Sequence, residues 1–377
     1  MNKKEISELK KQFTPERNVI HRVCGCYVDG EKNIILKSKE AFPSLPEEDA
    51  FKYFDIFRKT LSGTLGKNLL NMAFPLEQES EGGTQEFLMR LRKSELKDDA
   101  LLEQFYQNII DSYDYGLNYY IILIYGVYDV PGKSTDGAEM FDASDAVYDY
   151  LLCCICPVNL SKAALGYNPV SNHMEDRNRD WVVDAPAKGF LFPAFNDRQT
   201  DIHNVLYYTK NVDDLQEDLI ANVLGASSLP LAAGSQKETF NTLLEESLGD
   251  DCSYETVKNI HETIHEMIEQ NKENPEPLLL GKQDVKHILE KNDVEDEKIE
   301  TFEKKFDERF DDTPGNHTTM LASNITNTRS FDIKTPDVVI KVNPQRADLI
   351  ETQVIDGRKC IVIPINDELE INGIRVK

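Results

Sequence analysis

The chain has 377 residues, a mass of 43.0 kDa and a formal net charge of −25. Its length predicts two or three domains, and its 40% hydrophobic content excludes wholesale disorder. The acidic excess argues against a nucleic-acid-binding protein and against docking on an anionic membrane, because both functions need a basic surface.

Three features of the sequence bear on the cellular compartment: the first residues, the length of the apolar runs and the cysteines. Residues 1–11 are charged throughout and do not resemble a signal peptide. The longest apolar runs, 119–128 and 150–158, are much shorter than the ~20 residues of a membrane-spanning helix. Seven cysteines spread thinly through the chain are typical of a reducing compartment. We therefore expect a cytoplasmic protein without membrane contact.

In chain order, the first half alternates helical and strand-like patterns. A short helix over 3–13 precedes a hairpin of strands 19–28 and 33–36, joined at Asp29-Gly30. Helical spacing predicts an amphipathic helix over 46–61, with Phe51, Phe54 and Phe57 on one face, and one long helix over 84–113. The apolar runs 118–130 and 148–158 predict strands buried on both faces. Strands 189–195 and 202–210 then flank a polar loop.

A boundary is expected near 229–234, after which Ser235 and Glu238 form a capping-box signature. Helices are predicted over 236–248, 254–271, 282–291 and 295–311, in a stretch whose residues 235–312 carry 10 basic and 23 acidic side chains. Strand patterns follow at 331–334, 338–342, 351–355, 359–364 and 368–376, with a hairpin turn at Asp356-Gly357. The acidic stretch 235–312 could imitate the phosphates of DNA. Charge runs of this kind are, however, usually the solvated faces of helices.

Several stretches of the sequence together resemble one family. The stretches are 3–8 (KKEISE), 13–17 (FTPER), 24–30 (CGCYVDG), 61–68 (LSGTLGKN), 189–198 (GFLFPAFNDR), 335–344 (TPDVVIKVNP), 354–358 (VIDGR) and 371–374 (INGI). They are similar to an uncharacterised family of soluble proteins from anaerobic Gram-positive bacteria, catalogued as a domain of unknown function. The resemblance covers nearly the whole chain and implies a cytoplasmic bacterial protein. It brings no activity and no catalytic residues.

The H-E-x-x-H spelling at His261, Glu262 and His265 is the sharpest motif match. On a helix it places two imidazoles one turn apart, as a zinc protease requires, with the Glu as general base. Two features argue against a zinc site. Acidic residues follow the second histidine, and an apolar stripe on the same helix already accounts for the face that is buried. We expect the two histidines at a solvated helix edge.

The cysteines permit a second metal hypothesis. Cys24 and Cys26 share one face of a strand, as do Cys154 and Cys156, and two adjacent strands could assemble four thiolates for zinc or an iron–sulfur cluster. A redox pair is a further alternative. Both strands are otherwise apolar, so we favour buried structural thiols and expect no metal. The glycine-rich stretch 62–68 lacks the spacing of a phosphate-binding loop.

The polar loop at 196–203 is the remaining candidate site. It carries Asp197, Arg198, Asp201 and His203, which could orient a ligand, position a phosphate or supply acid–base groups. The alternative is a hairpin turn whose Asn and Asp satisfy the backbone while Arg198 pairs with a carboxylate. A second polar loop at 172–180 would add to the site if the two loops met.

The sequence thus predicts an α+β fold with a mixed, largely antiparallel sheet and packed helices. It divides into a sheet domain over 1–230, an acidic helical segment over 235–312 and a small β module over 330–377 that packs on the rest. The leading hypothesis is a non-enzymatic binding or regulatory protein that recognises a protein or small molecule and uses no cofactor. The alternative is a hydrolase- or transferase-like enzyme that uses the loop at 196–203.

Overall fold

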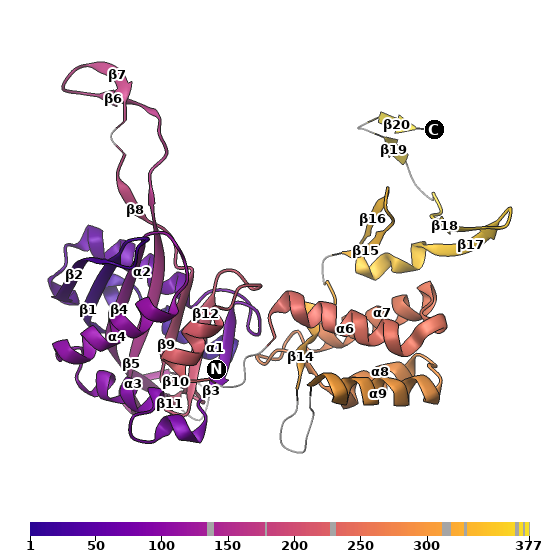
Figure 1. Ribbon diagram of the computed structural model, residues 1–377, viewed down its shortest axis with the longest axis horizontal. Coiled ribbons are helices and arrows are strands. Elements are labelled where there is room, and N and C mark those ends of the chain that lie inside the picture. The colour runs from indigo at the N-terminus through magenta and orange to yellow at the C-terminus, as the bar shows by residue number, and fades with distance from the viewer. Residues whose placement is uncertain are drawn as a thin grey trace. The chain divides into compact units, whose positions relative to one another are not determined.

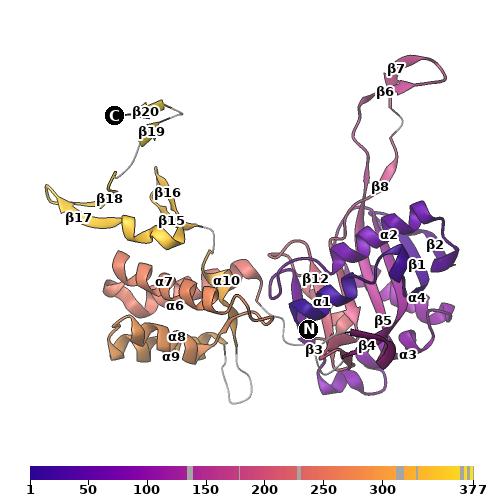
Figure 2. The same ribbon diagram turned by 180° about the vertical axis from the view of Figure 1, so that it is seen from behind.

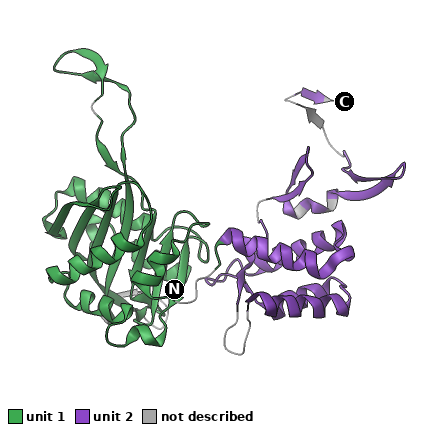
Figure 3. Ribbon diagram, in the orientation of Figure 1, with its two compact units in different colours: residues 1–232 green, residues 233–377 purple. Residues whose placement is uncertain are grey.

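The computed structural model describes residues 1–133, 139–177, 179–226, 231–310, 318–327, 330–365, 369–371 and 374–376. These residues form two compact units, 1–232 and 233–377, shown in separate colours in Figure 3. The finer three-part division predicted from the sequence stays a prediction.

Unit 1 is built on a large antiparallel sheet, so the predicted α+β class is confirmed (Figure 1). In the described residues it has eight strands, ordered β2-β1-β4-β5-β9-β12-β3, with β8 paired to β5. Its strands are β1 (Ile20–Val28), β2 (Ile34–Ala41), β3 (Leu69–Ala73), β4 (Tyr119–Lys133), β5 (Glu139–Leu160), β8 (Trp181–Val183), β9 (Lys188–Phe192) and β12 (Asn204–Thr209).

Helices cover both faces of this sheet (Figures 1 and 2). On one face α1 (Lys3–Lys10) and α2 (Glu47–Thr60) pack against alternate residues of β4, such as Ile122 and Ile124. On the other, α3 (Thr84–Lys93) and α4 (Asp99–Ser112) pack against Ile121 and Leu123. Because both faces are covered, β4 and β5 read as continuous apolar runs, as the sequence predicted.

The single helix predicted over 84–113 is wrong, since two helices occupy this stretch. Glu95 and Leu96 have φ values of 52° and 58°, in the left-handed region that an α-helix cannot contain. The side chain of Asp98 then caps α4 by accepting hydrogen bonds from the backbone N–H groups of Ala100 and Leu101, at 2.9 and 3.2 Å. Leu96 is fully buried, so its packing holds the turn in place.

Two further expectations for unit 1 need correction. Phe51 is 45% exposed, whereas Phe54 and Phe57 are buried as predicted, so the apolar face of α2 is narrower than expected. Burial of the second predicted strand begins at Tyr148 as expected, but the strand itself starts at Glu139, because β5 pairs with β4 before the buried part.

Between β5 and β9 the chain makes a long hairpin, residues 158–183, which we call the arm. At its base Val158, Asn159 and Leu160 pair with β8, and at its end β6 (Leu165–Asn168) pairs with β7 (His173–Asp176). Figure 1 shows the arm leading away from the sheet, at the end remote from β10 (Ala194–Asn196) and β11 (Gln199–Asp201). The polar loops at 172–180 and 196–203 therefore do not meet.

Unit 2 is a helical unit, and the four helices predicted for it are confirmed to within a few residues. They are α6 (Ala233–Leu248), α7 (Tyr254–Gln270), α8 (Lys282–Lys291) and α9 (Asp296–Phe310). They share a core with α10 (Ala322–Ile325) and the paired strands β13 (Leu279–Leu280) and β14 (Met320–Leu321). Ser235 lies inside α6 and is not its cap, because the helix begins at Ala233.

The C-terminal strands form two-stranded hairpins in the described residues. They are β15 (Phe331–Lys334) with β16 (Val339–Val342), β17 (Glu351–Ile355) with β18 (Arg358–Val362), and β19 (Leu369–Ile371) with β20 (Ile374–Val376). The single strand expected over 368–376 is thus two. The turn at Asp356-Gly357 is confirmed, with φ values of 50° and 75° that suit a two-residue hairpin turn. No helix within the described ranges is both long and apolar enough to cross a membrane.

Candidate functional site

The polar loop at 196–203 is a tight hairpin. Asn196 pairs with Gln199 across the β10–β11 ladder, and Asp197 and Arg198 form the turn with φ values of 51° and 58°. Two successive residues of positive φ define the turn type that joins adjacent antiparallel strands.

Arg198 pairs with a carboxylate on α1. Its guanidinium donates to Glu8, with an N···O distance of 3.0 Å, and to the backbone oxygen of Pro131 at 2.9 Å. Both charged side chains are less than one-fifth exposed. The backbone N–H of Asp197 donates to Glu5 at 2.8 Å, and Tyr128 donates to Glu8 at 3.0 Å. These hydrogen bonds and the Arg198–Glu8 ion pair hold the hairpin turn against α1, and they leave both buried charges paired.

The side chains of Asp201 and His203 have different hydrogen-bond partners, although the backbone N–H of His203 donates to Asp201. Burial disfavours the ionised form of Asp201, but hydrogen bonds from Asn196, Asn204 and the backbone of His203 outweigh this effect and lower its pKa. The exposed His203 contacts Glu79 at 2.7 Å, and this hydrogen bond raises the pKa of His203. Arg198, Asp201 and His203 thus engage different neighbours and do not converge on one point.

A cavity of about 550 Å³ lies beside this network. Its described lining includes Glu8, Tyr128 and Pro131 together with Lys4, Lys11, Arg17 and Asp129. None of the four predicted side chains is among its described lining residues, although Glu8 connects Arg198 to it. The wall of this cavity is polar, and its Glu8 carboxylate is already paired with Arg198.

The H-E-x-x-H residues His261, Glu262 and His265 are each half-buried, so the helix edge on which they lie is less solvated than expected. His261 contacts the ring of Phe240, and its Nδ1 contacts the Thr326 hydroxyl at 2.7 Å. Burial lowers the pKa of His261 to about 4. In the described chain, Nδ1 of His265 is buried without a hydrogen-bond partner. Both histidines and Glu262 line a pocket of about 260 Å³. In the part of the chain that the structure describes, no three His, Cys, Asp or Glu side chains are placed so that they could hold one metal ion.

The cysteines occupy opposite faces of the sheet. Cys24 and Cys26 belong to the core beneath α3 and α4, whereas Cys154 and Cys156 belong to the core beneath α1 and α2. Strand β4 also separates β1 from β5, so the four thiols cannot share one metal ion. Burial raises the pKa of Cys24 and of Cys26 to about 11 and that of Cys154 to about 12. All seven cysteines are free.

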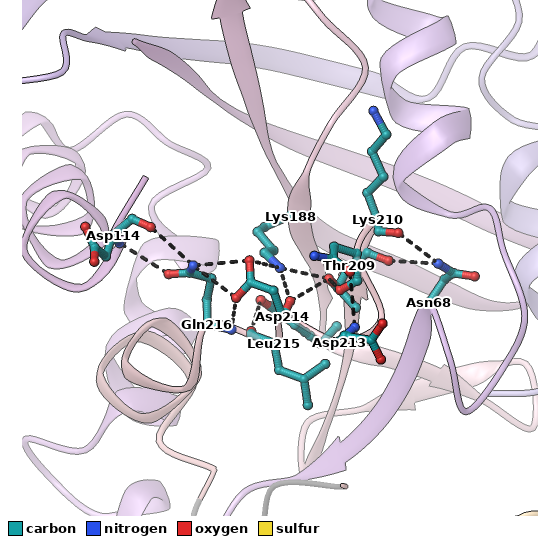
Figure 4. Close-up of polar contacts among 11 residues, drawn as sticks. Asn68, Asp114, Lys188, Thr209, Lys210, Asp213, Asp214, Leu215 and Gln216 are labelled. Atoms are coloured by element: carbon teal, nitrogen blue, oxygen red, sulfur yellow. Dashed lines mark hydrogen bonds and ion pairs between the residues drawn. The ribbon is translucent and has the colours of Figure 1, made fainter. Parts of the chain in front are cut away.

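A buried lysine that sequence reasoning missed anchors the loop after β12 (Figure 4). Lys188 is 2% exposed, and its Nζ donates to the Thr209 hydroxyl at 2.9 Å and to the backbone oxygen of Asp214. The Asp214 carboxylate lies 3.3 Å away. Burial lowers the pKa of Lys188, and Asp214 partly opposes this shift. A lysine at the head of the apolar run 188–192 was the only signal in the sequence.

A large groove lies between α2 and β8 in unit 1, and we call it the α2–β8 groove. Its volume is about 1080 Å³. Its apolar lining includes Ile56, Tyr120, Trp181, Val182 and Val183. Charged side chains of both signs, including Lys52, Asp55 and Lys59, also line it. Trp181 is 57% exposed and is the sole tryptophan of the chain.

No curated protein matches the chain. A family model described as "Domain of unknown function (DUF4317)" matches residues 1–374. Because that match covers almost all of the 377 residues, the chain belongs to this family.

Proposed function

We propose that the protein is a non-catalytic binding protein that holds an apolar ligand, or an apolar segment of a partner, in the α2–β8 groove. The observation that carries this proposal is the groove itself, at about 1080 Å³ with an exposed tryptophan and valines in its wall. Ligand sites are typically concave and mostly apolar, with a few polar groups that fix orientation.

The alternative, a hydrolase- or transferase-like enzyme built on Asp197, Arg198, Asp201 and His203, ranks second. Acid–base catalysis needs the participating groups within hydrogen-bond reach of one substrate atom. These side chains instead fasten α1, close the β10–β11 hairpin and pair with Glu79. A cytoplasmic location in bacteria is also part of the proposal, and the free, mostly buried cysteines support the reducing compartment.

The experiment combines native mass spectrometry with tryptophan fluorescence. We expect natively purified protein to carry an added mass, and expect Ile56→Glu, which places a charge in the groove, to lose it. Leu76→Glu is the matched control, because Leu76 is 79% exposed and does not line the groove. Energy transfer from Trp181 to the apolar probe anilinonaphthalene sulfonate should fall in the Ile56→Glu variant only.

Two results would refute the proposal. If both variants kept the added mass and the energy transfer, the ligand would lie outside the groove. If the wild type carried no added mass and showed no energy transfer, the groove would not bind apolar molecules.

A further inference from the structure

The cavity of about 550 Å³ beside α1 has three cations in its wall. They are Lys4 of α1, Lys11 at the end of that helix, and Arg17 of the short helix Pro15–Arg17. In the part of the chain that the structure describes, none of the three side chains forms an ion pair or a hydrogen bond. The protein has 67 acidic residues against 42 basic ones, so cations gathered without a carboxylate partner require an explanation.

The carboxylate that could neutralise these cations is already occupied. Glu8 follows Lys4 by four residues and precedes Lys11 by three, which are spacings at which ion pairs form along a helix. The Glu8 carboxylate instead pairs with Arg198 at 3.0 Å and accepts a hydrogen bond from Tyr128 at 3.0 Å. Lys4 also lies in the first turn of α1, where the helix dipole disfavours a cation. The local structure of α1 therefore gives no reason for a lysine at this position.

The charge and the size of the cavity match a small phosphorylated molecule. Apart from Glu8, which Arg198 neutralises, the acidic residue of the described lining is Asp129, so the three cations leave the wall with a charge of +2. A phosphate monoester carries a charge of about −1.5 to −2 at pH 7. The volume falls within the range of about 300–1,000 Å³ that is typical of small-molecule sites. Val19 and Val127 supply apolar wall for the rest of such a molecule.

We propose that this cavity binds a small phosphorylated molecule, whose phosphate group is held by Lys4, Lys11 and Arg17. Ammonium and guanidinium groups form short, charge-assisted hydrogen bonds with phosphate oxygens. The site is separate from the α2–β8 groove, because the two share no lining residue in the described ranges.

The test is isothermal titration calorimetry in a phosphate-free buffer, with ribose 5-phosphate, inorganic phosphate and ribose as probes. We expect ribose 5-phosphate to bind at one site, inorganic phosphate to bind more weakly and ribose not to bind. Lys4→Gln and Arg17→Gln should each raise the dissociation constant at least about tenfold, because each removes a charge-assisted hydrogen bond. Lys3→Gln is the matched control, since Lys3 is the adjacent exposed lysine of α1 and does not line the cavity. It should change the constant by no more than about twofold, because solvent screens its charge.

Three results would overturn the proposal. The first is no saturable binding of ribose 5-phosphate at ~10 mM. The second is equal affinity for ribose 5-phosphate and inorganic phosphate, which would make the free ion the ligand. The third is equal weakening by Lys3→Gln and Lys4→Gln, which would assign binding to the general charge of this surface. Near-UV circular dichroism would confirm that each variant is folded. Ile56→Glu should leave phosphate binding unchanged, so none of these results depends on what the α2–β8 groove holds.

Discussion

Replacing Lys188 with methionine removes the cation that anchors the loop over 209–216 while keeping most of the side-chain volume. The ammonium group contacts the Thr209 hydroxyl and both the backbone and the carboxylate oxygens of Asp214 (Figure 4). A hydrogen bond from a charged donor contributes about 1.5–3 kcal/mol, and breaking a fully buried ion pair costs about 3–5 kcal/mol. Asp214 is 46% exposed, so water can resolvate its carboxylate. We therefore expect the free energy of unfolding to fall by about 2–3 kcal/mol.

Near-UV circular dichroism during urea denaturation is the appropriate assay. Trp181 and every tyrosine except Tyr254 lie in unit 1, so the signal reports on the unit that contains Lys188. Lys210→Met is the matched control, since Lys210 is exposed and contributes its backbone oxygen to the cluster. The control should change stability by no more than about 0.5 kcal/mol. The reasoning is refuted if Lys188→Met stabilises unit 1, or if both variants behave alike.

Further predictions concern the other buried polar groups. Arg198→Ala should destabilise unit 1 by about 1–2 kcal/mol and expose α1 to limited proteolysis, because Glu8 loses its cationic partner and keeps only the Tyr128 hydroxyl among the contacts described above. Unchanged cleavage would contradict the role of Arg198 in holding α1. In native protein, Ellman's reagent should titrate only the partly exposed Cys252 and Cys360, and unfolding should release all seven thiols; rapid reaction of a third thiol would contradict the raised pKa values. Burial holds the pKa of His261 at about 4, below its ordinary 6.5. Unit 2 should therefore lose about 3 kcal/mol of stability as the pH falls from 6.5 towards 4. His261→Gln should make its stability less dependent on pH, as measured by far-UV circular dichroism during denaturation. An unaltered slope in the variant would assign the effect to other groups.

Whether a segment forms a helix or a strand could mostly be predicted from the local spacing of its apolar residues. The helices α6 to α9 keep apolar residues at helical spacing, and their own stripes form the core of unit 2. The buried strands β4 and β5 were predicted because a run of β-branched and aromatic residues without polar alternation requires cover on both faces. The break at Glu95 and Leu96 was missed because the apolar spacing continues through it, and burial of Leu96 by the rest of unit 1 supports its backbone.

The candidate sites depended on contacts between distant segments, which one sequence does not reveal. The hairpin alternative for Arg198 was foreseen, but its partner Glu8 lies 190 residues away along the chain. The strand order excludes a shared metal site for the four cysteines. Strand β4 lies between β1 and β5, and the two pairs of thiols lie on opposite faces of the sheet. The hydrogen-bond partner of His261, Thr326, lies 65 residues further along the chain, where helical periodicity gives no information about it.

Local pattern and composition were enough to predict most helices and strands, the acidic character of the chain and its resemblance to a family without an assigned activity. Which polar groups meet depended on how distant segments pack. That packing brought Lys188 to Asp214, fastened Arg198 to α1 and formed the α2–β8 groove. The physical reason is that burial and ion pairing depend on which elements pack together, and the order of strands in the sheet sets that packing.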